Sequence, residues 1–284
     1  MKKNNAFNNV IFLTRIFLTG AFFAYSVLAA GLFFMQERYI YNPSSIIKAT
    51  PVQEGISYED VTFSTEDGIN IHAWFVPVDN SRGTVLFCKG NYYNISDLLP
   101  TIRVFRRMGY SALFFDYRGY GESSGQPSEA GTYRDSEAAW SYLTGVRGCE
   151  PSQIVVFGRS LGGPVAAKLA SIHNPGGLVL ESTFTSMPDL AADAYPLLPA
   201  RKLARFNYNT MDFVSRVQCP VYIIHSPDDE KIPFDHGLAL YESAPGEKSM
   251  LVIGGNHYDG FLLDLDHYVH GLESFFQSAI VPGA

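Results

Sequence analysis

The chain has 284 residues, of which 46% are hydrophobic, and this is enough for one large domain with a substantial core. Its formal net charge of −7 argues against a nucleic-acid partner, because a surface that binds phosphates needs an excess of basic residues. The three cysteines are an odd number, and two of them flank apolar runs, which favours buried thiols over a disulfide framework.

The first feature along the chain is an uncharged, apolar run at residues 16–35, which is long enough to cross a bilayer as a helix. Two lysines and an arginine precede it, so the charge bias predicts a cytoplasmic tail at residues 1–15 and an extracytoplasmic remainder. Residues 27–29 resemble a signal-peptide cleavage site, so secretion after cleavage is the alternative. We favour an uncleaved transmembrane anchor, because the apolar run continues beyond that site. A linker is expected at residues 36–55.

The remaining chain, residues 56–284, is expected to form one α/β domain in which apolar strands alternate with helices. It opens with an antiparallel hairpin of strands at 56–64 and 69–77, joined by a Glu-Asp-Gly turn signal. Continuous apolar strands separated by helices indicate a mostly parallel sheet that is covered on both faces. The later strands are expected at residues 84–88, 111–115, 154–157, 177–180, 221–225 and 250–253, and the helices at 95–108, 129–145, 161–173, 233–243 and 258–277.

The stretch Gly158-Arg159-Ser160-Leu161-Gly162 lies between an expected strand and an expected helix. Gly-x-Ser-x-Gly in that context is typical of a nucleophile elbow. The two glycines remove side chains that would clash in the tight turn, and the turn holds the serine hydroxyl at the positive end of the following helix. We therefore predict that Ser160 is a catalytic nucleophile.

A serine hydroxyl needs a general base, normally a histidine that a carboxylate orients. His257 follows the last strand through a glycine-rich loop and opens the last helix, so the loop can fold back toward the elbow. We predict that His257 is the base. His267 and His270 have the i,i+3 spacing of a metal pair, but such a pair is more often a solvated helix face, and we expect no metal site. The other four histidines suit structural roles: His72, His173, His225 and His236.

The acid should follow a strand between the elbow and the base, in the chain order Ser, Asp, His. Asp228 and Asp229 follow one such strand, and Glu181 follows another. We choose Asp229, because the residues after it close the loop into the next helix. Asp228, Glu181 and a merely solvated acidic turn are the alternatives.

An oxyanion that develops during acyl transfer needs two backbone N–H donors. Leu161, the residue after the serine, is expected to supply the first. The loop that follows the strand at residues 84–88 is expected to supply the second, from the N–H of Asn91.

With these motifs the chain resembles the α/β-hydrolase superfamily from about residue 56 to the last helix. More narrowly, it resembles the membrane-anchored Bem-type branch, and it is similar to prolyl-oligopeptidase-like catalytic domains. The resemblance implies an α/β-hydrolase fold, a Ser160–Asp229–His257 triad, a structural acid at Glu181, and hydrolysis of esters, thioesters or amides without a cofactor. It is carried by the stretches at residues 36–43, 115–125, 158–163, 180–186 and 225–233.

The loop that carries Asn91 departs from the pattern of this branch. The branch usually reads His-Gly-Asn-Ala-Gly-Asn, whereas residues 89–94 of this chain read Lys-Gly-Asn-Tyr-Tyr-Asn. Lys89 replaces a histidine that stabilises the loop. Tyr92 and Tyr93 replace two small residues, and we expect them to line and narrow the substrate pocket or to reorient the loop.

The resemblance also implies a small helical lid at about residues 185–210, with Tyr195 and Leu198 lining an acyl pocket beneath it. The first functional hypothesis is a membrane-anchored serine esterase or thioesterase that acts on a small or lipid-derived acyl group. A peptidase of prolyl-oligopeptidase type and a non-catalytic scaffold that keeps the fold are the alternatives.

Overall fold

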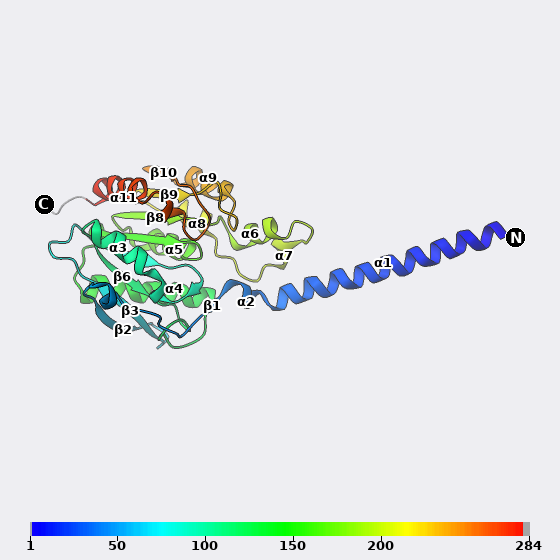
Figure 1. Cartoon of the computed structure of the whole chain (residues 1–284), viewed down its shortest axis with the longest axis horizontal. Helices are drawn as coiled ribbons and strands as arrows, with labels where there is room; N and C mark the ends of the chain where they lie inside the picture. Colours follow the sequence, from blue (N-terminus) through cyan, green and yellow to red (C-terminus); the bar gives the residue numbers. More distant parts are fainter. Residues whose placement is uncertain (1, 281–284) are drawn as a thin grey trace.

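A long helix, α1 (Lys2–Phe34), projects from an α/β domain in the computed structural model, which describes residues 2–280 (Figure 1). Within it, Ile11–Phe34 is long and apolar enough to cross a membrane, and this segment is not buried against the domain. A helix of this kind matches the apolar run that the sequence predicted, although it begins earlier. A short helix, α2 (Gln36–Ile40), follows it.

The domain is built on an eight-stranded sheet in the order β10-β9-β8-β7-β4-β6-β3-β2. The strands are β2 (Glu59–Ser64), β3 (Asn70–Val76), β4 (Thr84–Cys88), β6 (Ser111–Phe115), β7 (Ile154–Arg159), β8 (Gly177–Glu181), β9 (Val221–His225) and β10 (Lys248–Val252). β3 runs antiparallel to both of its neighbours, and the other neighbouring pairs are parallel. The predicted mostly parallel sheet is therefore confirmed, with each strand near its expected position.

Helices cover both faces of the sheet and create two apolar cores. The longer ones are α3 (Leu99–Arg107), α4 (Glu129–Ser141), α5 (Gly162–His173), α9 (Phe234–Ser243) and α11 (Leu265–Ala279), and the shorter ones are α8 (Thr210–Val214), α10 (Gly260–Leu263), η1 (Pro51–Glu54), η2 (Ile95–Leu98), η3 (Tyr142–Val146) and η4 (Pro151–Gln153). Alternate side chains of β4 enter different cores: Leu86 packs with α4 and α5, whereas Phe87 packs with α3 and α11. Burial on both faces explains why these strands read as unbroken apolar runs.

Residues 36–55, which the sequence suggested as a linker, pack against the domain instead. Ile40 and Tyr41 are buried. The short strand β1 (Asn42–Pro43) then pairs in parallel with β5 (Tyr92–Tyr93), which belongs to the loop after β4. The segment after α1 therefore fixes the position of that loop.

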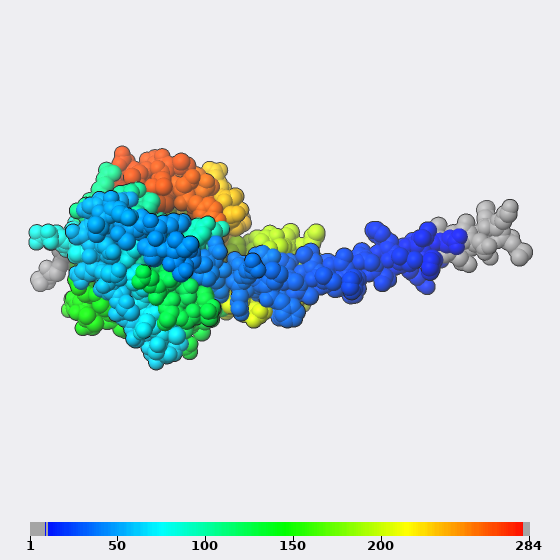
Figure 2. All heavy atoms as spheres, turned by 60° about the horizontal axis from the view of Figure 1, so that its bottom comes forward, coloured from blue at the N-terminus to red at the C-terminus, as the bar shows by residue number. Residues whose placement is uncertain are grey.

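Helices α6 (Met187–Ala194) and α7 (Ala200–Leu203) occupy the range in which the lid was predicted. They lie beside the end of α1 in both views (Figure 1, Figure 2). The hydroxyl of Tyr25 in α1 donates to the carbonyl of Leu197 (3.1 Å), and the Gln36 amide donates to the carbonyl of Leu203 (2.8 Å). The lid segment is therefore fastened to the apolar helix as well as to the domain.

Replacing Gly162 with alanine should lower the free energy of unfolding by about 3 kcal/mol, because the added Cβ overpacks a rigid site. That Cβ would lie 1.9 Å from the carbonyl oxygen of Cys88, and neither backbone is free to move away. Gly145→Ala is the matched control, since its Cβ meets nothing within 4 Å. Denaturant unfolding of the two full-length variants measures the difference, and equal losses would contradict the prediction.

Candidate active site

Ser160 lies in the tight turn between β7 and α5, with a left-handed φ of +53°. A Cβ at Gly158 would lie 2.5 Å from the carbonyl oxygen of Gly162, and one at Gly163 would lie 2.0 Å from Thr183 Oγ1. The Thr183 hydroxyl also donates to the Ser160 carbonyl (2.7 Å). Glycine is therefore required where the chain is most crowded, and the crowding holds the serine in its unusual conformation.

The structure brings Ser160, His257 and Asp229 together. His257 Nε2 lies 3.0 Å from Ser160 Oγ, and His257 Nδ1 lies 2.8 Å from Asp229 Oδ2. The other carboxylate oxygen accepts the N–H groups of Lys231 and Ile232, both at 2.9 Å. Burial on its own raises the pKa of Asp229, but the hydrogen bonds from His257 and the two N–H groups outweigh it and hold the pKa below its usual range. The ionised carboxylate thus orients the imidazole toward the serine.

The two alternatives to Asp229 lie elsewhere. Asp228 is exposed. Glu181 is buried, but its carboxylate accepts a hydrogen bond from Tyr268 (2.7 Å) and forms an ion pair with Arg159 (3.0 Å). Glu181 therefore ties β8 to α11 beneath the elbow, which is a structural position.

Within the described residues no other histidine hydrogen-bonds to Ser160, although His225 Nε2 lies 3.6 Å from Asp229 Oδ2. His225 is buried at the end of β9, where its Nε2 lies 2.9 Å from a carbonyl of the next loop. His236 Nε2 lies 2.9 Å from the Asp193 carboxylate and so links α9 to α6. His267 and His270 are exposed on α11.

Leu161 and Asn91 both line the cavity beside the serine hydroxyl. Within the described residues, the N–H groups of these two residues donate to no other group. The Asn91 loop is firmly held, because its carbonyl accepts from the Tyr120 hydroxyl (3.0 Å) and its side-chain amide donates to the carbonyl of Ile40 (2.9 Å). Two fixed N–H groups therefore remain for an oxygen placed next to Ser160.

Lys89 is buried beneath this loop. Its ammonium lies 3.6 Å from the Asp116 carboxylate and 3.8 Å from the centre of the Tyr120 ring, and it donates to the carbonyl of Tyr92 (3.3 Å). Burial lowers the pKa of Lys89 to about 8 and raises the pKa of Asp116 to about 6, while the attraction between the two charges opposes both shifts. The lysine therefore stabilises the loop through these contacts.

A cavity of about 620 Å³ opens above Ser160, between α2, the Asn91 loop, α6 and the loop after β9. Tyr92 and Tyr195 line it, as the sequence suggested. The hydroxyl of Tyr258 donates to that of Tyr92 (2.8 Å), and the two rings meet edge to face with centres 5.3 Å apart. This tyrosine pair joins the Asn91 loop to the His257 loop and narrows the cavity. Sequence reasoning missed Tyr258, although its position next to His257 was a signal.

Two further residues that we expected in this pocket lie outside it. Tyr93 has a φ of +43°, and its ring lies under the ammonium of Lys48 at 4.3 Å. Leu198 instead lines a second cavity of about 120 Å³ between the end of α1 and the lid helices. Both placements depend on side-chain direction, which is set by how the segments pack.

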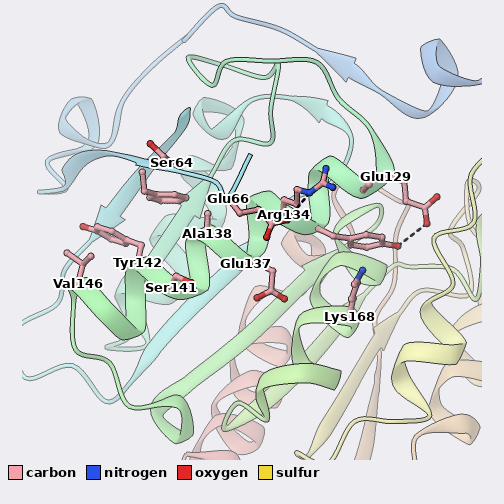
Figure 3. Close-up of a pocket in the computed structure, with 13 residues that line it drawn as sticks. Ser64, Glu66, Glu129, Arg134, Glu137, Ala138, Ser141, Tyr142, Val146 and Lys168 are labelled. Carbon is pink, nitrogen blue, oxygen red and sulfur yellow. Dashed lines mark hydrogen bonds and ion pairs between the residues drawn. The ribbon is translucent and has the colours of Figure 1, made fainter. Parts of the chain in front are cut away.

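A larger groove, of about 1040 Å³, lies between β2 and α4 (Figure 3). Its charged side chains are engaged with protein groups: Arg134 pairs with Glu66 (3.0 Å), Glu129 accepts from Tyr133 (3.1 Å), and the Lys168 ammonium stacks on the Tyr133 ring (4.1 Å). The smaller cavity at the elbow is the better candidate, because it contains the hydrogen-bonded Ser, His and Asp side chains.

The family model described as serine aminopeptidase, S33, matches residues 79–211. The alpha/beta hydrolase domain-containing protein WAV2 of Arabidopsis thaliana is 34% identical over 255 residues, which cover 80% of this chain and 82% of that protein. This chain belongs to the α/β-hydrolase family. The uncharacterized protein Rv2307c of Mycobacterium tuberculosis is 35% identical over 87% of this chain and 89% of its own length. The uncharacterized membrane protein YNL320W of Saccharomyces cerevisiae is 32% identical over 89% of this chain and 93% of its own length.

Solved structures share the fold of this α/β-hydrolase. The Pyrococcus furiosus esterase Pf2001 aligns with a TM-score of 0.73 at 20% identity, over 85% of this chain and 99% of that one. An alpha-beta hydrolase from Vibrio vulnificus aligns with a TM-score of 0.66 at 21% identity, over 85% and 90% of the two chains. The expected fold class is therefore confirmed.

Lys89→Met should destabilise this α/β-hydrolase by about 3 kcal/mol near neutral pH, because it leaves the Asp116 carboxylate buried without its cation. The loss of unfolding free energy caused by Lys89→Met should grow as the pH rises. The pKa of Asp116 lies above its unfolded value, so the folded state binds more protons and stability falls as pH rises through that window. Without Lys89 the pKa of Asp116 rises further. The decrease in stability with rising pH then becomes larger and extends to higher pH.

Denaturant unfolding at pH 5 and pH 8 checks this prediction. The difference in unfolding free energy between wild type and Lys89→Met should be larger at pH 8. Adding Asp116→Asn to the variant should recover part of the loss, because the amide carries no charge to leave unpaired. A loss that is equal at both pH values would count against the buried pair.

Proposed function

We propose that this α/β-hydrolase is a membrane-anchored serine hydrolase that cleaves carboxylic esters or thioesters through an acyl-serine intermediate. The observation that carries the proposal is the pair of hydrogen bonds at His257, 3.0 Å to Ser160 Oγ and 2.8 Å to Asp229 Oδ2. They give the serine a base and give the base an orienting carboxylate, which is what acyl transfer from an ester requires.

In the first half of the reaction, His257 Nε2 takes the proton of Ser160 as its oxygen attacks the acyl carbon. The N–H groups of Leu161 and Asn91 donate to the oxyanion. His257 then gives the proton to the departing alcohol or thiol, and the acyl group stays on the serine. In the second half, water loses a proton to His257 and attacks the acyl-serine, which releases the acid and restores the hydroxyl. Asp229 stays ionised and stabilises the imidazolium throughout.

The membrane part of the proposal rests on α1. Ile11–Phe34 has 24 residues, which at 1.5 Å per residue span about 36 Å, and a hydrocarbon core is about 30 Å thick. The positive charges before it support an N-terminus in the cytoplasm. The name of the yeast relative also supports a membrane location. Cleavage after Ala29 would separate Tyr25 from the lid, so the contact between them favours a retained anchor. These features support membership of the Bem-type branch.

A serine aminopeptidase is the second candidate, because the matched family model carries that description. Ester and amide hydrolysis proceed through the same steps and differ in the leaving group, which is an amine in the peptidase reaction. A panel that offers the same acyl group as a p-nitrophenyl ester and as a p-nitroanilide ranks them. Turnover of the anilide without turnover of the ester would reverse our order, and would favour the prolyl-oligopeptidase-like alternative.

Ser160→Ala should lower kcat on p-nitrophenyl esters by about 10⁶-fold, since the three side chains act as one unit. A fluorophosphonate probe should label the wild type and not this variant. Ser141→Ala, at an exposed serine of α4, is the control and should retain both activities. Equal turnover with and without Ser160 would refute the proposal, and a folded wild type that resists labelling would favour the non-catalytic scaffold.

A reporter fused to the C-terminus should lie on the extracytoplasmic side, because the basic residues before the apolar run retain the N-terminus in the cytoplasm. Alkaline phosphatase fused there should be active, and green fluorescent protein should stay dark. The opposite pattern would reject the orientation. The intact mass of the isolated protein separates anchor from signal peptide, since cleavage near residue 29 would shorten the chain.

A further inference from the structure

The cavity between α1 and the lid is apolar and adjoins the one above Ser160. The helix contributes Ala29, Leu32 and Phe33 to its wall, and the lid contributes Leu198 and Leu203. Four more residues line both cavities: Tyr39, Met187, Ala191 and Tyr195. The two spaces therefore adjoin and share part of their walls.

The tip of the lid, residues 194–200, lies alongside α1. Residues 194–200 read Ala-Tyr-Pro-Leu-Leu-Pro-Ala and carry no charge. Leu197 is 89% exposed, and its carbonyl accepts the hydrogen bond from Tyr25. Tyr25 precedes the end of α1 by nine residues, which is about 14 Å along the helix axis. With Ile11–Phe34 in a hydrocarbon core, the lid tip lies within the adjacent leaflet.

Basic side chains gather where this segment would leave the hydrocarbon. Arg201, Lys202 and Arg205 follow the apolar tip and are exposed. Gln36 places these basic residues beside the end of α1, because its side chain forms hydrogen bonds with the backbone of Leu203 and of Arg205, both at 2.8 Å. Exposed cations next to an apolar insertion suit the headgroup layer.

We propose that the cavity between α1 and the lid admits an acyl chain of a membrane glycerolipid directly from the leaflet. The inference rests on the proposed function and names its substrate class, a long-chain ester held in the bilayer. The chain passes between α1 and the lid, and its ester carbonyl reaches Ser160 past Met187 and Tyr195. The ester bond to glycerol breaks, the acyl group transfers to Ser160, and the glycerol oxygen takes the proton from His257. Water then releases the fatty acid.

Two neighbouring positions on α1 test this path with matched variants. Ala29 lines the cavity, whereas Ala30 is exposed and does not. Ala29→Trp should fill the cavity and lower hydrolysis of dioleoylglycerol in phosphatidylcholine vesicles by at least about 10-fold, with hydrolysis of p-nitrophenyl acetate within two-fold of wild type. Ala30→Trp should leave both rates unchanged. A long-chain rate that survives Ala29→Trp would overturn the path. Turnover of an S-palmitoyl peptide but not of the glycerolipid would overturn the substrate class.

A second measurement is independent of catalysis. Leu197→Trp adds an indole at the lid tip, and Val146→Trp adds one at an exposed site of η3. The two native tryptophans, Trp74 and Trp140, are buried. In vesicles with brominated phosphatidylcholine, the fluorescence added by Leu197→Trp should be quenched and that added by Val146→Trp should not. Absence of quenching overturns the inserted lid even if esters are hydrolysed, and quenching in a protein without esterase activity refutes only the proposed function.

Discussion

The close packing of the turn between β7 and α5 is the constraint on which the rest of the site depends. A Cβ at Gly162 would collide with the end of β4, and one at Gly163 would collide with the segment after β8. The N–H of Ser160 donates to the carbonyl of Glu181 (2.9 Å), and the Ser160 carbonyl accepts from Thr183. Because the turn touches both neighbouring strands, Ser160 is held at a fixed distance from the Asn91 loop. Movement of any of these segments would displace the Ser160 hydroxyl from both His257 and the N–H groups of Leu161 and Asn91.

A buried ion pair, rather than apolar packing, supports the Asn91 loop on the side of the domain core. Asp116 is confined, since a Cβ at Gly121 would lie 2.1 Å from one carboxylate oxygen, and the other oxygen accepts the N–H of Ile95 (3.0 Å). Lys89 then bridges this fixed carboxylate and the carbonyl of Tyr92. A buried pair of this kind adds little net stability compared with apolar side chains. Its effect is positional, because the ammonium ties the loop to the turn after β6.

The mostly parallel sheet and the meeting of Ser160, Asp229 and His257 could be predicted from the sequence, because parallel strands end at one edge of the sheet and local signals mark those ends. The choice between adjacent residues was harder. Asp229 turns inward because the N–H groups of the following loop bind its carboxylate, and the loop closure read from the sequence was an indirect sign of this. Tyr92 and Tyr93 are equivalent in the sequence. Their directions depend on the pairing of β5 with β1, which lies about fifty residues earlier in the chain.

The segment after α1 also explains why the walls of the cavity were not predicted from the sequence. Tyr39 and Ile40 line the space above Ser160, although they belong to a stretch that reads as a linker. Tyr41, next to them, is buried with its hydroxyl 2.7 Å from that of Tyr208, where the lid segment rejoins the domain. The residues between α1 and the sheet therefore hold the α6–α7 segment and the Asn91 loop at the same time. A chain shortened to the α/β domain alone would lose one wall of both cavities. On the proposed function, the preference for acyl-chain length measured on such a fragment would therefore differ from that of the full chain, even with an intact Ser160.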